Sequence, residues 1–322
     1  MIAEKWAAAE VYHWRSITDC WSTDFFETLN RFYDLRCELT GFLEDTILIE
    51  TTAIRLLVID LDGTVVGKSN QVEPPVLEAI QAAKAKGIRL AIATGRMYRS
   101  ALRFHQVIGS DLPLMTYQGA LIRDPLSDRL IRHWALDTDY AGQLLDYFEQ
   151  PELRDRLSVH FYINDQLYVR EIRPETVLYA ERSKIEPIAV GDLRKTLEQP
   201  PTKILALSDD TDLIDHLLVS LRQRYGPAEL YFTKSVATFF EAANPLVNKG
   251  TAVRYLAEEV LGLQPENVMT IGDNFNDVEM LEYAGVGVAM GNAPEPVRAI
   301  ADWVAPDVEE FGAAIAIKEL LL

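Results

Sequence analysis

Short apolar runs alternate with helical patterns along much of this 322-residue chain, and that alternation constrains the fold more than any other feature. Residues 56–59 (Leu-Leu-Val-Ile) form a wholly apolar run, as in a strand buried on both faces of a parallel sheet. A helical pattern over 74–86 follows, with Pro74 near its start and Gly87 just after its end. Further strands are expected over 89–93 and 113–117, with a helix over 98–108. This alternation predicts an α/β fold built on a doubly wound (Rossmann-like) parallel sheet.

The middle of the chain, residues 124–233, departs from this rhythm. Its apolar runs mix with helical patterns, and Asn164-Asp165 between two runs is typical of a hairpin turn. The expected elements are strands over 158–163, 166–169 and 203–208 and helices over 140–149 and 212–225. The segment is long enough to form an independent α+β domain.

The strand-helix rhythm returns towards the C-terminus. The expected elements are helices over 249–261, 276–284 and 295–301, strands over 267–271, 286–289 and 303–304, and a final helix. We therefore expect one core domain, over 53–123 and 234–322, that is interrupted by an inserted cap domain over 124–233.

The first 52 residues differ from the rest of the chain. Aromatic and apolar side chains recur there at spacings of three and four, which predicts a helical extension over 1–52. It is expected to pack on the main body. Alternatively it mediates self-association or binds a partner, or the start codon is wrongly assigned.

Charge and composition exclude several classes of function. The chain carries 31 basic and 49 acidic residues, a net charge of -18, which argues against nucleic-acid binding and against anionic membrane surfaces. We find no apolar run of membrane-spanning length and no signal peptide at the N-terminus. The two cysteines, Cys20 and Cys37, are too few for a disulfide scaffold and suggest free thiols in the cytoplasm.

Two carboxylates directly follow the first apolar strand, in the sequence Asp60-Leu-Asp62-Gly63-Thr. Residues two apart in an extended segment point the same way, so Asp60 and Asp62 are expected to face one site at the carboxyl end of the sheet. Two carboxylates this close need a cation or a shared proton. A simple turn is the alternative for an Asp before Gly63. An EF-hand calcium loop is excluded because its glycine belongs at the sixth position, not the fourth.

Two further segments at the same expected edge could bind an anion. Thr94-Gly95-Arg96 follows the second strand and offers a hydroxyl and backbone amides, although such a Thr is commonly just a helix cap. Lys249 begins a helix, where a cation opposes the macrodipole, and so suggests an anionic partner. An ordinary surface lysine is the alternative for Lys249.

A second acidic cluster, Gly-Asp-Asn-Phe-Asn-Asp over 272–277, follows the strand expected over 267–271. Asp60 together with Asp273 would suit Mg²⁺, which takes oxygen ligands, often only one or two carboxylates, and keeps several waters. The same oxygen ligands would accept Mn²⁺ or Co²⁺.

These four segments together resemble the four motifs of the haloacid dehalogenase superfamily in order and spacing, and Val-Ala-Met-Gly-Asn-Ala over 288–293 is similar to its Cof-type, class IIB branch. The resemblance covers residues 55–322. It implies a Mg²⁺-dependent phosphatase of small phosphorylated metabolites, of sugar phosphate or nucleotide type, that works through an aspartyl-phosphate intermediate. The presence of Asp62 favours phosphoryl transfer over dehalogenation.

The resemblance also implies roles for individual residues. Asp60 would be the nucleophile, and Asp62 the general acid and then the general base. Thr94 and Gly95 would bind the phosphoryl oxygens. Lys249 would neutralise the charge of nucleophile and phosphate, because a carboxylate attacks an anionic phosphate poorly without such help.

The implied metal site combines the Asp60 carboxylate, the main-chain carbonyl of Asp62 and Asp273. Binding through the carbonyl would leave the Asp62 carboxyl group free to carry a proton. Asn276 and Asp277 would complete the acidic loop, with Asp277 holding the catalytic lysine.

The sequence departs from the family at Gln118, where the family usually has Asn. The inserted segment over 124–233 matches the family's cap in position and length, which implies a lid that selects the substrate. Arg182, Lys184 and Lys203 in that segment are candidates to touch a leaving group, but charged residues are mostly exposed and we expect these three at the surface.

Two other functions remain open from the sequence. A phosphomutase would use the same intermediate but return the phosphoryl group to a second hydroxyl. A binding or regulatory protein would use the N-terminal helix as its partner surface, with an incidental hydrolase site.

Overall fold

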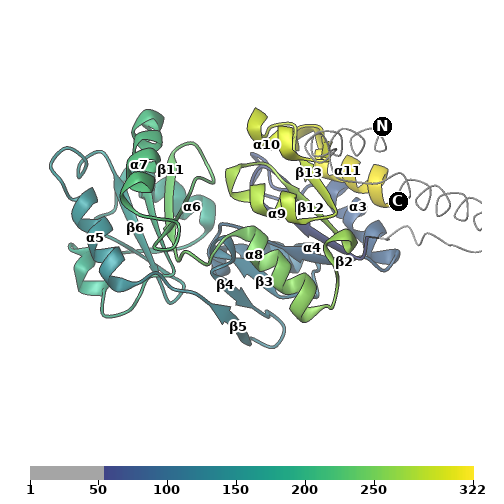
Figure 1. The fold of residues 1–322 in the computed structure, drawn as a ribbon, viewed down its shortest axis with the longest axis horizontal. Coiled ribbons are helices and arrows are strands. Elements are labelled where there is room, and N and C mark those ends of the chain that lie inside the picture. The colour runs from purple at the N-terminus through teal and green to yellow at the C-terminus, as the bar shows by residue number, and fades with distance from the viewer. Residues whose placement is uncertain (1–53) are drawn as a thin grey trace, which may run out of the picture. The chain divides into compact units, whose positions relative to one another are not determined.

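The computed structural model describes residues 54–322, which form three sheets flanked by helices (Figure 1). The helical extension predicted over 1–52 lies outside the described residues. Within 54–322, no helix combines the length and the apolar character that a membrane crossing needs.

A parallel five-stranded sheet is the base of the fold, and its strand order is β14-β13-β12-β1-β2. Its strands are β1 (Leu56–Ile59), β2 (Arg89–Ile92), β12 (Val268–Gly272), β13 (Val286–Ala289) and β14 (Trp303–Val304). The chain runs outward from β1 to β2 and later continues on the other side of β1 with β12. The strand order therefore reverses between β1 and β12, and open α/β sheets bind ligands at the carboxyl ends of strands at such a point.

Helices cover both faces of this sheet. Leu57 and Ile59 of β1 pack with α3, α4 and α11, whereas Leu56 and Val58 pack with α8 and α9. The bounds of these helices are α3 (Pro74–Ala85), α4 (Tyr98–Ile108), α8 (Lys249–Arg254), α9 (Val278–Tyr283) and α11 (Gly312–Leu321); α10 (Glu295–Ile300) precedes β14. Side chains alternate between the faces of a strand, so an apolar run such as β1 requires cover on both sides.

Two expected elements differ in detail. The strand expected over 113–117 is β3 (Leu114–Thr116), which touches the parallel sheet through one bridge between Ala93 and Met115. It pairs antiparallel with β4 (Leu121–Arg123), which pairs with β5 (Leu130–His133). The helix expected over 249–261 is α8 followed by a π-helical stretch, Tyr255–Val260.

The inserted segment and the residues that follow it up to Ala243 build a six-stranded sheet in the order β10-β11-β9-β6-β7-β8. The predicted cap boundary at residue 233 is therefore too early, because β11 pairs with β9 and β10 of this sheet. The neighbours are antiparallel except β7 and β8. Its strands are β6 (Ser158–Ile163), β7 (Gln166–Val169), β8 (Pro187–Ala189), β9 (Lys203–Leu207), β10 (Tyr231–Thr233) and β11 (Phe239–Ala243). The predicted fold class, a parallel-sheet core with an inserted α+β cap, is confirmed.

The two faces of the cap sheet have different tasks. Ile204 and Ala206 of β9 pack against α5 (Thr138–Phe148) and α7 (Thr211–Arg224). Lys203, Leu205 and Leu207 face the opposite way and line a cavity, and α6 (Pro174–Ser183) lines the same cavity. The sequence prediction missed α6, β8, β10 and β11, and also the strands β4 and β5 that precede the cap sheet.

Candidate active site

Asp60 stands at the carboxyl end of β1, where its backbone N–H donates to the Ile271 carbonyl at 3.0 Å. The residue is 4% exposed. Three residues on, Gly63 has a φ of +80°, and a Cβ added there would lie 2.1 Å from Asp273 Oδ2. A glycine is therefore required at this turn both by backbone conformation and by the close approach of the Asp273 carboxylate.

Lys249 begins α8 and is fully buried. Its Nζ donates to Asp60 Oδ1 at 2.6 Å and to Asp277 Oδ1 at 2.5 Å. Asn248 caps the helix by accepting from the Thr251 N–H at 2.7 Å, which fixes the position of the first turn. The structure thus brings together three residues that lie far apart in sequence, and the surface-lysine alternative for Lys249 is wrong.

Burial and pairing shift the pKa values in this cluster. Burial alone would lower the pKa of Lys249, but Asp277 and Asp60 outweigh it, so that pKa is raised and the ammonium stays charged. Burial raises the pKa of Asp60 to about 7, against the opposing effect of Lys249. A second cation beside Asp60 would lower this pKa and favour the ionised carboxylate at neutral pH.

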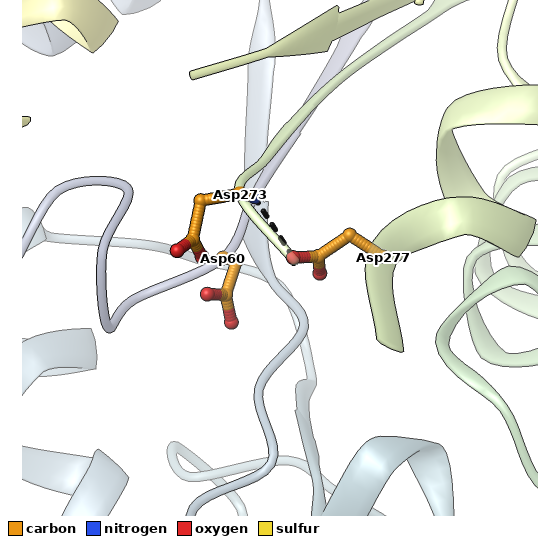
Figure 2. Close-up of side chains that lie close together, drawn as sticks. All are labelled: Asp60, Asp273 and Asp277. Atoms are coloured by element: carbon orange, nitrogen blue, oxygen red, sulfur yellow. Dashed lines mark hydrogen bonds between the residues drawn. The ribbon is translucent and has the colours of Figure 1, made fainter. Parts of the chain in front are cut away.

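Asp60, Asp273 and Asp277 have carboxylate oxygens within 4.8 Å of one another (Figure 2). Both Asp277 oxygens are already engaged: Oδ1 accepts from Lys249, and Oδ2 accepts from the Asp273 and Asn274 N–H groups at 2.9 and 3.0 Å. Asp273 accepts longer bonds, from Asn292 Nδ2 at 3.3 Å and Thr64 Oγ1 at 3.5 Å.

Burial raises the pKa of Asp273 well above its ordinary value, and the Asp277 and Asp60 charges raise it further. Asp60 and Asp273 therefore form an all-oxygen pair that is repulsive without a cation, which fits a hard divalent ion such as Mg²⁺. Asp277, the third acidic residue, positions the lysine and the loop instead.

The Thr94-Gly95 segment follows β2 and lies beside this acidic cluster. Thr94 is 1% exposed, and its Oγ1 accepts from the Arg96 N–H at 3.2 Å. Gly95 leaves no room for a side chain, because a Cβ there would lie 2.4 Å from Gln118 Nε2. Thr94 and Gly95 both line the cavity beside Asp60. The Thr94 hydroxyl group and the backbone of Gly95, which a ligand can approach closely, therefore lie where an anion could bind.

Asp62 is held by two arginines. Arg96 donates to it in a bidentate manner, from Nε and Nη2, both at 2.6 Å. Arg182 of α6 donates from Nη2 to Asp62 Oδ1 at 2.9 Å. Burial would raise the pKa of Asp62, but Arg96 and then Arg182 outweigh it and lower the pKa. In this conformation Asp62 is a carboxylate.

A buried polar network joins the cap to the Thr94-Gly95 segment. Lys203 Nζ donates to Glu241 Oε2 at 2.9 Å and to the Gly95 carbonyl at 2.8 Å. Gln118 Nε2 donates to the same Glu241 oxygen at 3.1 Å, and Gln118 Oε1 accepts from Asn276 Nδ2 at 3.0 Å. Gln118, the departure from the family pattern, thus has the length to bridge the cap and the acidic loop.

The expectation that the cap cations lie at the surface is wrong for Lys203, whose side chain is 4% exposed. Charged side chains are rarely buried unless paired, and the partner, Glu241, lies on a strand that the sequence prediction missed. Arg182 remains 47% exposed but contacts Asp62, and Lys184 is exposed as expected.

A cavity of about 480 Å³ lies between these groups and the cap. Asp60, Asp62, Thr94 and Gly95 line one part of it, together with Gly63, Asp273 and Asn276. The predicted residues that do not line it are Lys249 and Asp277, which lie beneath Asp60. Its volume is in the range of small-molecule sites in proteins.

Known proteins resemble this chain over most of the residues that the structure describes. The family model described as haloacid dehalogenase-like hydrolase matches residues 57–317. The putative phosphatase YxeH of Bacillus subtilis is 30% identical over 276 residues, which is 83% of this chain and 98% of that protein. The 5-amino-6-(5-phospho-D-ribitylamino)uracil phosphatase YitU of the same organism is also 30% identical, over 82% of this chain and 96% of its own length. The solved structure of the subclass IIB sugar phosphatase BT4131 shares the fold, with a TM-score of 0.69, 22% identity and coverage of 82% of this chain and 98% of that one.

Proposed function

The chain belongs to the haloacid dehalogenase-like hydrolase family, and from that premise we propose that it is a Mg²⁺-dependent phosphatase of small phosphorylated metabolites that forms an aspartyl-phosphate on Asp60. The observation that carries the proposal is the convergence of Asp60, Asp273 and Lys249 beside one cavity. A nucleophilic carboxylate, an oxygen pair for a divalent cation and a buried ammonium are the groups that this chemistry needs.

In the first step a carboxylate oxygen of Asp60 forms a bond to phosphorus while the bond from phosphorus to the leaving oxygen breaks. Lys249 lies 2.6 Å from that carboxylate and offsets the charge that gathers there. When bound at Asp60 and Asp273, Mg²⁺ supplies Lewis-acid stabilisation of the phosphoryl charge. Thr94 and Gly95 orient the remaining phosphoryl oxygens.

Asp62 acts on the leaving oxygen. The incoming phosphate is an anion and competes for Arg96 and Arg182, which raises the pKa of Asp62 once they release it. Asp62 then takes up a proton from solvent and donates it to the leaving oxygen. In the second step it accepts a proton from the water that attacks phosphorus, and inorganic phosphate leaves Asp60 free.

The domain boundaries are part of the same proposal, with one change: the core over 53–123 and 234–322 carries the chemistry except for β11, and the cap over 124–233 extends through β11 to Ala243 and selects the substrate. The name of YitU describes an aminouracil attached to phosphate through a ribityl chain. We include compounds of this type, together with sugar phosphates and nucleotides, among the candidate substrates.

Phosphate release from a panel of phosphorylated metabolites tests the proposal, with and without Mg²⁺. Asp60→Asn keeps the side-chain volume but removes the nucleophile, and we expect a loss of about a thousandfold or more. Asp155→Asn makes the same chemical change at a side chain that is 90% exposed and should keep full activity.

Mass spectrometry of the acid-quenched enzyme should find a phosphoryl group on the peptide that contains Asp60. Undiminished turnover by a clean Asp60→Asn preparation would overturn the mechanism. Production of an isomeric sugar phosphate in place of free phosphate would instead identify a mutase.

A further inference from the structure

We propose that the leaving group of the substrate ends in a planar, uncharged nitrogen heterocycle, joined to the phosphate through a sugar or polyol chain, and that Tyr179 and Phe239 of the cap bind this ring. The inference rests on the proposed phosphatase function and names the substrate class for the same site. Three observations support it: the cavity has an apolar wall, the cationic side chains that line the cavity are already paired, and the cavity extends along α6.

The cap side of the cavity is largely apolar. Leu205 and Leu207, both nearly fully buried, form its floor on β9, and the ring of Phe239 on β11 lies beside that of Tyr179 on α6. The two ring centroids are 6.0 Å apart with the planes tilted by 59°. Leu178 and Val236 extend this surface.

Such a wall favours a flat ring over a plain sugar. A sugar bound here would place hydroxyl groups against Leu205 or Leu207. Each of these hydroxyls would lose its hydrogen bonds to water without gaining a protein partner, and this desolvation costs binding free energy. A heterocycle buries its apolar faces and keeps its polar atoms at the edge, and aromatic side chains bind such faces well.

The charges in the wall argue against a second anionic group on the leaving group. Within the described residues, three cationic side chains line the cavity, and each already has an anionic partner. Arg96 and Arg182 hold Asp62 at the reacting end, and Lys203 is paired with Glu241. A second phosphate or a carboxylate on the leaving group would therefore meet no free cation there.

Acceptors, in contrast, are available. Glu175 Oε2 is buried and has no hydrogen-bond partner, its nearest cation being Arg173 Nε at 3.6 Å. Asp209 lines the cavity as well, at an exposed position, so Glu175 supplies the buried acceptor. Buried acceptors favour ligands that carry donors, so an amino group or a ring N–H fits the edge of the heterocycle.

The position of Glu175 sets the length of the leaving group. Glu175, Tyr179 and Arg182 are spaced by four and three residues and lie on one face of α6. Arg182 contacts Asp62, and seven residues of helix separate it from Glu175 by about 10 Å at 1.5 Å per residue. A ring attached directly to the phosphate by one carbon would stop short, whereas a ring on a sugar or polyol chain would reach Tyr179 and Glu175.

Matched substrate pairs test the proposal in the full-length, Mg²⁺-loaded enzyme. AMP is compared with ribose 5-phosphate, and riboflavin 5′-phosphate with ribitol 5-phosphate, so that each pair differs by its ring. We expect kcat/KM to favour the ring-bearing member of at least one pair by about tenfold or more. Acetyl phosphate, which has no ring and no chain, reports the basic activity.

Tyr179→Leu and Phe239→Leu should reduce that preference severalfold and leave the rate with the ringless member and with acetyl phosphate unchanged. Tyr147→Leu is the matched control, because Tyr147 is half-buried on α5 at the other face of the cap sheet. It should leave the preference intact.

Equal kcat/KM within both pairs, or a preference that neither variant alters, would overturn the inference while acetyl phosphate hydrolysis keeps the proposed function standing. If wild type hydrolyses none of the five compounds, acetyl phosphate included, the proposed function itself fails and this inference fails with it.

Discussion

Arg182 of the cap helix α6 lies 2.9 Å from Asp62, Nη2 to Oδ1, and this contact joins the cap to the proposed general acid. It lies alongside the bidentate contact from Arg96. The pair of arginines holds Asp62 ionised until something displaces them.

Replacement of Arg182 should therefore change the pH dependence of the reaction. Removing a cation beside a carboxylate raises the pKa of that carboxylate, so the pKa of Asp62 should rise in Arg182→Gln. The limb of the kcat/KM profile that reports deprotonation of Asp62 should therefore move to higher pH. Arg156→Gln, which changes an exposed cap arginine paired with Asp210, should leave the profile in place. An unchanged profile in Arg182→Gln would contradict the assignment of Asp62.

Lys249 should matter for stability as well as for activity. Its removal leaves Asp60 and Asp277 as buried carboxylates without a cation, so Lys249→Met should lower the free energy of unfolding by about 3–5 kcal/mol. Urea denaturation without Mg²⁺ measures this. Lys318→Met, at an exposed position on α11, is the control. Adding Asp277→Asn to Lys249→Met should recover part of the loss, and a further loss would contradict the pairing.

Mg²⁺ affinity should rise with pH. Protons and the metal compete for Asp60 and Asp273, whose pKa values are raised in the metal-free site, to about 7 for Asp60. The rise in Tm on adding Mg²⁺ should therefore be larger at pH 8 than at pH 6. Asp273→Asn should abolish most of the shift, and Asp155→Asn should keep it. An equal shift at both pH values would argue against these two ligands.

His160 should make the cap sensitive to acid. It is fully buried on β6, and burial, followed by the charge of Lys203, lowers its pKa to about 3 from 6.5. Below pH 6.5 His160 binds a proton in the unfolded chain but stays neutral in the folded protein. The contribution of His160 to the free energy of unfolding is therefore complete above pH 6.5 and declines as the pH falls towards 3. Between pH 6.5 and 4.5 the loss amounts to about 2 kcal/mol.

His160→Gln removes this titration, and its free energy of unfolding should fall less steeply with acid than that of wild type. Denaturation at several pH values measures the slopes. His216→Gln, at an exposed position on α7, should behave like wild type. Equal slopes for wild type and His160→Gln would show that the imidazole is protonated without penalty.

The parts of the fold that could be predicted are those whose structure is determined by the local sequence of a single segment. β1 is apolar at every position because both its faces are covered, and α4 ends where Gly109 adopts a φ of +70°. The four loops of the candidate site could be placed at one edge for the same reason, since each directly follows a strand or begins a helix.

The parts that escaped prediction depend on residues distant in sequence. α6 lies between a cavity and solvent, with Val177 and Leu178 exposed, so it lacks an apolar stripe. Lys203 could not be recognised as buried without Glu241, which lies on a neighbouring strand. The contact of Arg182 with Asp62 likewise depends on how the cap meets the core, which sequence spacing does not encode.

The bond from Lys203 to the Gly95 carbonyl has a consequence for engineering this enzyme. A designer who transplanted a foreign lid onto this scaffold to obtain a new specificity would remove Lys203 and Glu241 together. Gln118 would then lose its acceptor and Gly95 its donor, both next to Thr94, the proposed phosphate-binding residue. If the cap selects the substrate as proposed, we expect that specificity cannot be exchanged without affecting turnover, and that a successful chimera has to keep the residues at positions 203 and 241.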